Sequence, residues 1–226
     1  MPKPRHAKRF LRPVFYIFCE GGKTEPYYLD HYIKKHCAGG RTVQVNQPKL
    51  TDIVKIPKTN KTDPNSLVGL AIKQKEKSPL PDKDCYWCAF DREAENEVAA
   101  CIPIKAMEKA TANGIKVAFS NVCFEVWLLL HKQAGCAPYG SCDDLLKRSK
   151  LTTYYPRYNK GDRREFTASE IADARKRAVK MDAETCTGNG QSVSEDIQPC
   201  QLVKLNPYTN FHRLLDAIDA FLASQA

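Results

Sequence analysis

The stretch 14-VFYIFCEGGKTEPYYLDHYI-33 decides the fold class, because a buried strand, a glycine turn and a helix follow one another in it. Val14 to Cys19 is apolar throughout, as expected of a central parallel strand that is covered on both faces. After the turn at Gly21-Gly22, we expect Thr24 to cap a helix. A strand followed directly by a helix is the repeating unit of α/β proteins.

The same alternation of strand and helix continues along the chain to about residue 132. We predict further strands over Thr42–Val45, Cys85–Phe90 and Ile115–Phe119. Helices are predicted after Asp63-Pro64, around Pro103 and from Phe124 to His131, and residues 46 to 62 read as a polar loop. The pattern predicts a mostly parallel, four-stranded sheet with helices on both faces.

Three regions differ in composition, and we expect them to differ in structure. Residues 1 to 12 read as a basic arm, 13 to 132 as the α/β core, and 133 to 226 as a helical, basic elaboration packed on that core. Within the last region, helices are expected after Ser141, after a capping box at Thr167 to Glu170 and after Asn206-Pro207, with a mobile loop over residues 183 to 201.

Charge is distributed unevenly over this basic chain, which has a formal net charge of +9. Residues 1 to 12 carry five basic groups and no acid, and residues 147 to 180 carry eleven basic groups against four acids. Residues 82 to 97 hold six acids against two basic groups. Basic surface attracts phosphates and clustered carboxylates hold cations, so the pattern suits a metal site that acts on a polyanion. A solvated, charged surface is the alternative.

Several classes of protein are excluded or disfavoured. No apolar stretch approaches the ~20 residues of a membrane span, and the basic start lacks the apolar segment of a secretory signal. The ten cysteines lie within predicted strands and helices, which indicates reduced thiols in a cytoplasmic, soluble protein. Cys85 and Cys88 have metal-ligand spacing, but along a strand they would point to opposite faces, which favours ordinary buried cysteines.

Gly22-Lys23-Thr24 resembles the end of a phosphate-binding loop, but the spacing excludes this motif. Its first glycine would have to stand at position 17, which is Ile17 inside the predicted strand. What remains at this strand end is the carboxylate of Glu20.

Acidic residues follow two of the predicted strands. Glu20 follows the first, and Asp91 and Glu93 follow the strand at 85 to 90. Ligands of parallel α/β sheets bind beyond the carboxyl ends of the strands, so these carboxylates are expected to face one pocket. A divalent cation such as Mg²⁺ would relieve their repulsion and activate a phosphodiester and a water. Alternatively, Asp91 and Glu93 are solvated or stabilise a helix N-terminus; Glu20 fits this reading less well, because an acid after a buried strand needs a partner.

Four blocks of the sequence resemble, in order, those of the RloB family, whose catalytic part is of the Toprim type. The blocks are IFCEGGKTEPYYLDHY, DCYWCAFDRE, FSNVCFEVWLLLH and LNPYTNFHRLL, and they extend from about residue 14 to residue 215. The resemblance implies a Toprim-like fold and a metal-dependent nuclease or related phosphotransfer activity in defence against phage, usually beside an ATPase subunit of the AAA or ABC type.

The resemblance also implies roles for single residues. Glu20 would be the catalytic base or acid and Asp91 a principal ligand of Mg²⁺ or Mn²⁺. Glu93 stands where the family pattern has a second aspartate; its extra methylene puts strict two-metal geometry in doubt, and Glu95 or Glu97 could compensate.

The block after the strand at 115 to 119 resembles the family's SNPCFELWL. Asn121 would line the pocket and Glu125 would help to hold the metal; an acid paired in the first turns of a helix is the alternative for Glu125. Lys23, beside Gly21 and Gly22 in the turn, could neutralise a transition-state phosphate, or could be a surface lysine.

The segment 152-TTYYPRYNKGDRR-164 alternates aromatic rings with cations. Stacking is worth ~1–3 kcal/mol per base, so this composition suits an unpaired or looped nucleic acid. The alternative is that the tyrosines pack against the sheet and the cations are solvated. The candidates for nucleic-acid binding are Tyr154, Tyr155, Arg157, Tyr158, Lys160, Arg163 and Arg164.

Two hypotheses of function follow from the sequence. The first is a Mg²⁺-dependent endonuclease that cuts RNA or DNA, with tRNA suggested by analogy with other Toprim defence effectors. The second is a non-catalytic subunit that keeps the fold and docks an ATPase or binds nucleic acid. A homodimer is compatible with both.

Overall fold

The computed structural model describes residues 11–37, 49–60, 63–94, 98–192 and 197–225. Within these ranges the chain forms a five-stranded sheet in the order β2-β1-β3-β4-β5. Strands β2, β1, β3 and β4 are parallel, and β5 runs antiparallel beside β4. The α/β class and the mostly parallel sheet predicted from the sequence are therefore confirmed. The strands are β1 (Phe15–Cys19), β2 (Val54–Lys55), β3 (Cys85–Asp91), β4 (Lys116–Asn121) and β5 (Tyr208–Thr209).

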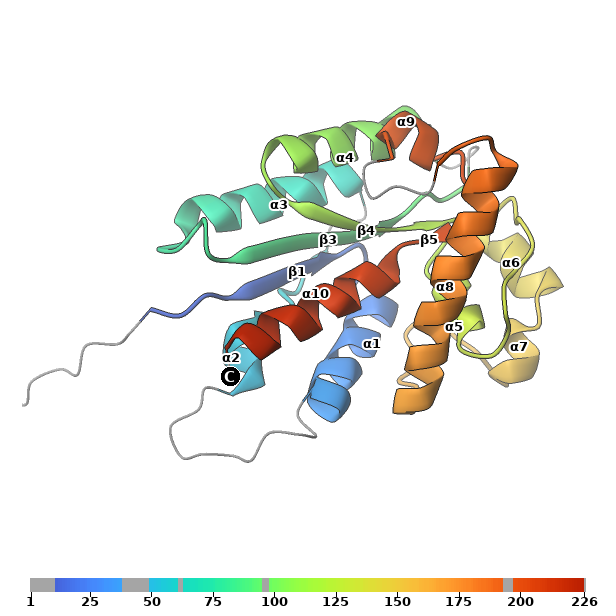
Figure 1. The fold of residues 1–226 in the computed structure, drawn as a ribbon, viewed down its shortest axis with the longest axis horizontal. Coiled ribbons are helices and arrows are strands. Elements are labelled where there is room, and N and C mark those ends of the chain that lie inside the picture. The colour runs from blue at the N-terminus through green and yellow to red at the C-terminus, as the bar shows by residue number, and fades with distance from the viewer. Residues whose placement is uncertain (1–10, 38–48, 61–62, 95–97, 193–196, 226) are drawn as a thin grey trace, which may run out of the picture.

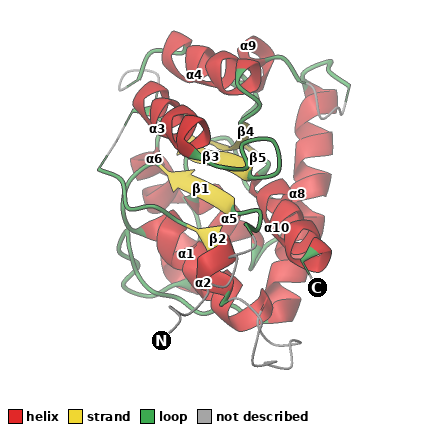
Figure 2. Cartoon of the chain, turned by 90° about the vertical axis from the view of Figure 1, so that its left-hand side faces the viewer, coloured by secondary structure: helices red, strands yellow, loops and turns green. Residues whose placement is uncertain are grey.

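Helices cover both faces of the sheet, as Figures 1 and 2 show from two directions. Helices α3 (Pro64–Lys77) and α4 (Cys101–Ala112) lie on one face, with the short α9 (Pro199–Leu202) against α4. The other face carries α1 (Thr24–Tyr32), α5 (Glu125–Leu130), α8 (Ala168–Gly188) and α10 (Phe211–Ser224). The remaining helices are α2 (Leu50–Ile53), the π-helix η1 (Ile33–Cys37), α6 (Cys142–Arg148) and α7 (Leu151–Tyr154).

The pleat of β1 divides the interior into two hydrophobic cores. Phe15 and Ile17 belong to the core under α1, α5 and α10, whereas Tyr16 and Phe18 belong to the core under α3 and α4. Successive side chains of a strand point to opposite faces, so a strand between two cores must be apolar throughout. This arrangement explains the uninterrupted apolar run of β1.

Three predicted helix starts are confirmed by their caps. The side chain of Asp63 accepts a hydrogen bond from Ser66 N at the start of α3, and Ser141 does the same for Asp144 N in α6. Thr167 forms the predicted capping box with Glu170 at the start of α8. In each case the side chain satisfies a helix N–H that has no partner in the helix itself.

The prediction that Thr24 caps α1 is wrong. Lys23 occupies the N-cap position without a side-chain cap, and Thr24 Oγ1 instead accepts a hydrogen bond from Gly161 N at 3.0 Å. The hydroxyl of Thr24, which the local sequence pattern assigns to the helix cap, therefore bonds to Gly161, 137 residues away in the sequence.

The sequence prediction also misses two short strands, β2 and β5, and ends helix α8 too early. Strand β2 and helix α2 form within residues 46 to 62, which read as a loop, while the strand predicted at 42 to 45 lies outside the described residues. The antiparallel strand β5 was not predicted. Helix α8 extends to Gly188, into the predicted mobile loop, and α9 lies in the later part of that loop.

The C-terminal region completes the sheet as well as packing on it. Strand β5 pairs with β4, and Asn210 continues the ladder: its N–H donates to Phe119 O at 3.1 Å and its Oδ1 accepts from Phe119 N at 2.6 Å. Helix α10 then runs across the face that carries α1 (Figure 1). In the described part of the chain, no helix is long and apolar enough to cross a membrane.

Replacing Asn210 by alanine should lower the free energy of unfolding by about 2 kcal/mol, because the buried N–H of Phe119 would lose its acceptor. The measurement is urea unfolding, with the change read from the midpoint at constant slope. Asn189→Ala is the control, since Asn189 is exposed and bonds only within its own helix end; it should cost no more than about 0.5 kcal/mol. Equal costs for the two variants would contradict this role of Asn210.

Candidate metal centre

Glu20 and Asp91 lie together at the carboxyl ends of neighbouring strands. Glu20 directly follows β1, and Asp91 is the last residue of β3. The parallel register, in which Cys19 pairs with Ala89, brings the two strand ends level. The backbone N–H of Asp91 donates to Glu20 Oε2 at 3.2 Å. Glu20 and Asp91 therefore lie side by side at the ends of neighbouring strands.

The carboxylate of Asp91 is held by the backbone of the next connection. Its Oδ2 accepts a hydrogen bond from Phe124 N at 3.0 Å, just before α5. Arg92 N donates to Ser120 O at 2.8 Å, so β3 and β4 remain paired to the point where the acids begin. Backbone donors thus fix both Glu20 and Asp91 before any ligand binds.

The charges of two further glutamates act on the carboxylate of Asp91. Glu25 lies in the first turn of α1 and Glu125 is the first residue of α5, and both are buried. Burial raises the pKa of Asp91 well above its usual value, and the charges of Glu25, Glu125, Glu93 and Glu20 raise it further, in that order. Acidic side chains from four segments of the chain therefore share one electrostatic environment.

The pKa values of Glu20 and Glu25 are raised as well. Burial raises the pKa of Glu20 to about 7, against the hydrogen bond from Asp91, and the charges of Glu93 and Asp63 add to the rise. Burial raises the pKa of Glu25 to about 8, with additional repulsion from Glu125 and Glu20 and a partial offset from Lys160. The positive charge of Lys160 therefore offsets only part of the effect of burial and of the neighbouring acids on the pKa of Glu25.

Glu93 lies at the edge of the group and faces a cleft of about 700 Å³. Its backbone has a positive φ of 56°, and its N–H donates to Val122 O at 3.1 Å. Glu95 and Glu97, considered from the sequence as substitutes for Glu93, lie outside the described residues. The cleft is lined by Arg92, Glu93, Ala100, Ile104, Asn121, Val122, Tyr139, Gly140, Cys200, Val203, Lys204 and Asn206.

The other predicted pocket residues have structural contacts. Asn121 reaches the cleft, but its side-chain amide donates to Val203 O at 3.1 Å and so holds the segment before β5. Gly21 has a φ of +77°, which favours glycine, and supplies the turn behind Glu20. Gly22 passes close to the backbone of Thr59. The alkyl chain of Lys23 lies over Gly161, whose position leaves no room for a side chain there.

The tyrosines of the aromatic-basic segment turn inward. Tyr155 is 4% exposed and donates from its hydroxyl to Leu128 O at 3.0 Å, and Tyr158 donates to Glu125 Oε1 at 2.8 Å. Tyr154 packs against the same core. The guanidinium of Arg164 lies over the rings of Tyr155 and Tyr158. In this conformation Tyr155 has no free face for a base, which matches the packing alternative that the sequence left open.

The cations of the segment lie nearer to solvent. Arg157, Lys160 and Arg163 are exposed, and the guanidinium of Arg163 stacks over Tyr27 of α1. Burial would lower the pKa of Lys160, but the charges of Cys142, Glu125, Cys123 and Glu93 outweigh it and raise that pKa. Lys160 therefore supplies positive charge to the acidic group.

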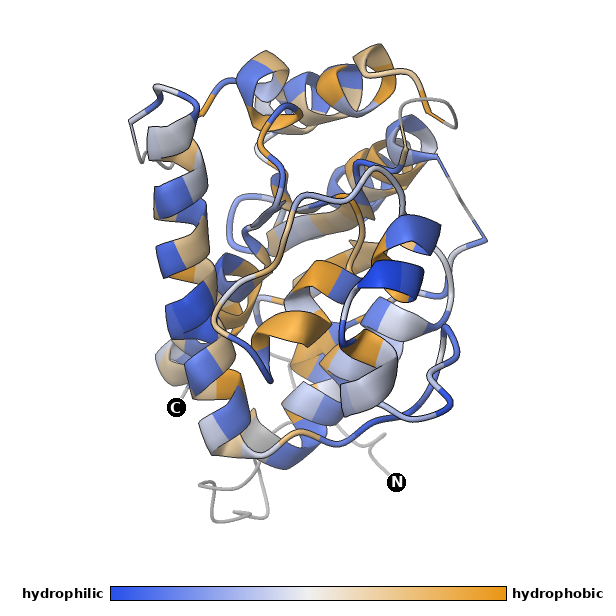
Figure 3. Cartoon of the chain, turned by 90° about the vertical axis from the view of Figure 1, so that its right-hand side faces the viewer, coloured by the Kyte–Doolittle hydropathy of each residue, from blue (hydrophilic) through white to orange (hydrophobic). Residues whose placement is uncertain are grey.

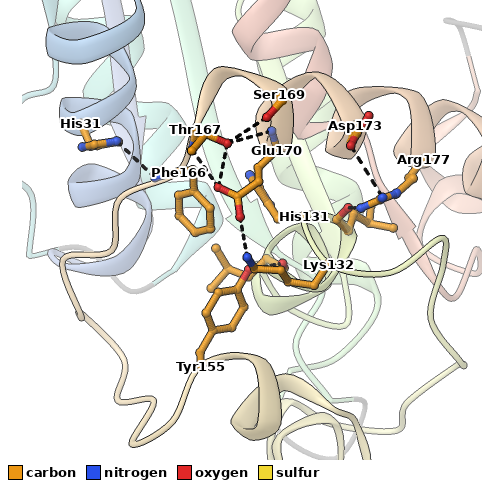
Figure 4. Close-up of polar contacts among 12 residues, drawn as sticks. His31, His131, Lys132, Tyr155, Phe166, Thr167, Ser169, Glu170, Asp173 and Arg177 are labelled. Atoms are coloured by element: carbon orange, nitrogen blue, oxygen red, sulfur yellow. Dashed lines mark hydrogen bonds and ion pairs between the residues drawn. The ribbon is translucent and has the colours of Figure 1, made fainter.

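The segment is anchored where it enters α8, as Figure 4 shows. Phe166 N donates to His31 Nε2 of α1 at 3.3 Å, and Glu170 forms an ion pair with Lys132, which follows α5. Thr167 and Glu170 close the capping box at the same point. These contacts hold the end of the segment against the last turn of α1 and the residues after α5. Figure 3 shows the molecule from the right-hand side of Figure 1, with hydrophilic and hydrophobic residues mixed along its helices.

Sequence reasoning missed Glu25, Cys123 and Cys142 as neighbours of the site. Glu25 could have been found, because the first turn of a helix that follows a strand lies at the same sheet edge as the strand end. Cys142 lies at the start of α6, and no local sequence pattern predicts that α6 brings it to Glu125 of α5.

The donor chemistry fits a divalent cation in two ways. Glu20, Asp91, Glu93, Glu25 and Glu125 offer carboxylate oxygens, the ligands of Mg²⁺. Burial, together with the charges of neighbouring acids, raises the pKa values of Glu20, Glu25 and Asp91. Among the described residues, the ligand atoms of Cys123, Glu125 and Cys142 all lie within 4.8 Å of one another. All ten cysteines are free thiols in the structure.

The raised pKa of Glu25 predicts a pH dependence of stability in the absence of divalent metal. The folded-state pKa of about 8 exceeds the ordinary value of 4.5, so this group favours the folded state fully below pH 4.5 and loses that effect as the pH rises to about 8. Glu25→Gln cannot ionise. Its stability relative to the wild type should therefore increase by at least about 1 kcal/mol between pH 5 and pH 8.

The measurement is urea unfolding of both proteins in EDTA at the two pH values. Glu108→Gln, which changes an exposed acid on α4, is the control and should alter the free energy of unfolding by no more than about 0.5 kcal/mol. A pH-independent difference for Glu25→Gln would show that Glu25 ionises in the folded state as it does in water.

Comparisons with known proteins add one finding to this geometry. A family model described as RloB-like protein matches residues 15–218, which span all five strands and most of α10. No curated protein and no solved structure matches the chain. The match covers most of the sequence and includes every acidic residue discussed above. The chain belongs to the family of RloB-like proteins.

Proposed function

We propose that this protein is a Mg²⁺-dependent phosphodiesterase of the Toprim type, which cuts RNA or DNA in defence against phage together with an ATPase partner. The observation that carries the proposal is the convergence of Glu20, Asp91, Glu25 and Glu125 at the carboxyl ends of the strands. Family membership supports it. A tRNA substrate and the ATPase partner rest on the family resemblance alone.

Asp91 and Glu20 are the proposed ligands of Mg²⁺ or Mn²⁺, with Glu93, Glu25 and Glu125 close enough to act on the same charge. When bound, such a cation polarises a phosphodiester and lowers the pKa of a water. The backbone N–H groups of Asp91 and Phe124 hold the two carboxylates at the strand ends. Preorganised donors of this kind avoid reorganisation when a ligand binds.

Glu20 is the proposed general base or acid. Before a cation binds, burial raises the pKa of its carboxyl group to about 7, and proton transfer is most efficient when this pKa lies near the working pH. Lys160 is a cation whose charge reaches the acids. We assign to Lys160 the neutralisation of developing negative charge on the phosphate.

The cleft beside Glu93 is the proposed path of the nucleic acid. Lys204 lines it and is exposed, whereas Arg92 lines it from a buried position; Arg157 and Arg163 are exposed on the aromatic-basic segment. Cations bind the phosphate backbone without regard to sequence. The buried Tyr155 stabilises the segment, and the exposed cations carry the proposed binding.

Asp91→Asn and Glu20→Gln should each reduce cleavage of labelled tRNA or plasmid by about 10²-fold or more in Mg²⁺ or Mn²⁺, because each removes a group that binds the cation or moves a proton. Initial rates of cleavage measure this. Glu108→Gln, with its change on the exposed face of α4, should cleave at the wild-type rate.

Cleavage that survives both substitutions would contradict the assignment of this site, because the activity would then come from elsewhere. If the wild type bound the metal at Asp91 but cleaved neither substrate, with and without an ATPase partner, the non-catalytic subunit would be the better description. Glu93, in the place of a second aspartate, is the feature that favours this second function.

Metal binding is tested without turnover by thermal unfolding. Mg²⁺ at 100 times its Kd should stabilise the wild type by about 2.7 kcal/mol, since a ligand that binds only the folded state acts by mass action. Asp91→Asn should lose this increase in Tm, and Glu108→Gln should keep it. An equal shift in Asp91→Asn would place the Mg²⁺ site elsewhere.

A further inference from the structure

Cys123, Glu125 and Cys142 form a second group of potential ligands, and the proposed reaction uses neither thiol. The side chains are 0%, 2% and 6% exposed, respectively. Cys142 Sγ lies 3.4 Å from Glu125 Oε2, and the ligand atoms of all three residues lie within 4.8 Å of one another. Two thiols and a carboxylate at this spacing have the composition of a zinc site.

The distance between Cys142 Sγ and Glu125 Oε2 agrees with the distance expected between two ligands of one cation. With Zn–S of about 2.3 Å and Zn–O of about 2.0 Å, two tetrahedral ligands lie about 3.5 Å apart for sulfur and oxygen, and about 3.8 Å apart for two sulfurs. The observed 3.4 Å between Cys142 Sγ and Glu125 Oε2 is close to the first value. All three ligand atoms lie within 4.8 Å of one another. Small side-chain movements would therefore bring the two sulfurs to the distance of about 3.8 Å expected around a shared zinc ion.

Separate parts of the fold hold the three side chains in place. Cys123 lies in the short connection between β4 and α5, Glu125 begins α5, and Cys142 begins α6. The hydroxyl of Tyr158 donates to Glu125 Oε1 at 2.8 Å, while Oε2 faces Cys142. A neighbour that binds the second oxygen of a ligating carboxylate fixes its orientation, as is usual around protein metal sites.

The charge around the group also suits a bound cation. Glu125 is buried, and its two oxygens accept hydrogen bonds from neutral donors, Tyr158 and Cys142. Lys160 is the cation within electrostatic reach of Cys142, Glu125 and Cys123. Two thiolates and one carboxylate carry three negative charges, which a divalent cation and Lys160 together would balance.

We propose that Cys123, Glu125 and Cys142 bind one thiophilic divalent cation of the Zn²⁺ class, with the fourth position taken by water. Thiolate ligands select Zn²⁺ or Cd²⁺ over Mg²⁺, which prefers oxygen. The site shares Glu125 with the carboxylate group around Asp91, but its two thiolates give it a different metal preference from that of Glu20 and Asp91. It does not rest on the proposed nuclease activity, and it is measured without substrate.

The test titrates the reduced, metal-free full-length protein with Cd²⁺ and follows the ultraviolet charge-transfer absorption of cadmium thiolates. We expect saturation at one equivalent in the wild type. Cys142→Ser and Cys123→Ser should each lose at least half of this absorption, because each removes one of two thiolates. Cys101→Ser and Cys200→Ser, which change exposed cysteines, and Cys186→Ser, in the other core, should behave as the wild type.

Zn²⁺ should displace the bound Cd²⁺, and a thousandfold excess of Mg²⁺ should not. Absence of the absorption in the wild type, or its persistence in both Cys123→Ser and Cys142→Ser, would overturn the proposal and leave a buried network of hydrogen bonds. Far-ultraviolet circular dichroism checks that each variant is folded. If a variant is unfolded, the proposal is judged by whether the wild type shows the cadmium-thiolate absorption at one equivalent. The Mg²⁺-dependent rise in Tm should persist in Cys142→Ser, which separates this site from the one at Asp91.

Discussion

The repulsion among buried carboxylates is the constraint on which the rest of this structure depends. Asp91 accepts a hydrogen bond from Phe124 N and lies in the field of Glu25, Glu125, Glu93 and Glu20. Removing like charges from water into one enclosed place is costly unless they are protonated or a cation is bound. The backbone donors and Lys160 offset only part of that cost, so protonation of the acids or a bound cation has to supply the rest.

The topology explains how the acids gather from distant parts of the sequence. Parallel strands end at one edge of the sheet, so Glu20 and Asp91 meet there, and the helices that follow begin at the same edge, which adds Glu25 and Glu125. The C-terminal region then completes the sheet through β5 and lays residues 155 to 166 against α1. This segment brings Tyr158 and Lys160 to the acids, so the site depends on both halves of the chain.

The sequence predicts the features that local pattern determines. The apolar runs of β1, β3 and β4 identified a buried parallel sheet, and the acids at their ends predicted the meeting of Glu20 with Asp91. Strands β2 and β5 have two residues each, too few for any period to show. Interleaved rings and cations have the same composition whether tyrosines stack on bases or pack in a core, and only the tertiary contacts of Tyr155 and Tyr158 distinguish the two. Cys142 reaches Glu125 through the placement of α6, which no local pattern encodes.

The central claim is that the gathered carboxylates hold a divalent cation. The most direct measurement is an anomalous difference map from crystals of the protein grown with Mn²⁺, which locates the ion without reference to activity. The account predicts a peak at about 2–2.5 Å from a carboxylate oxygen of Asp91, with Glu20 bound directly or through water. A fully ordered site in which Asp91 and Glu20 contact no such peak at saturating Mn²⁺ would contradict it.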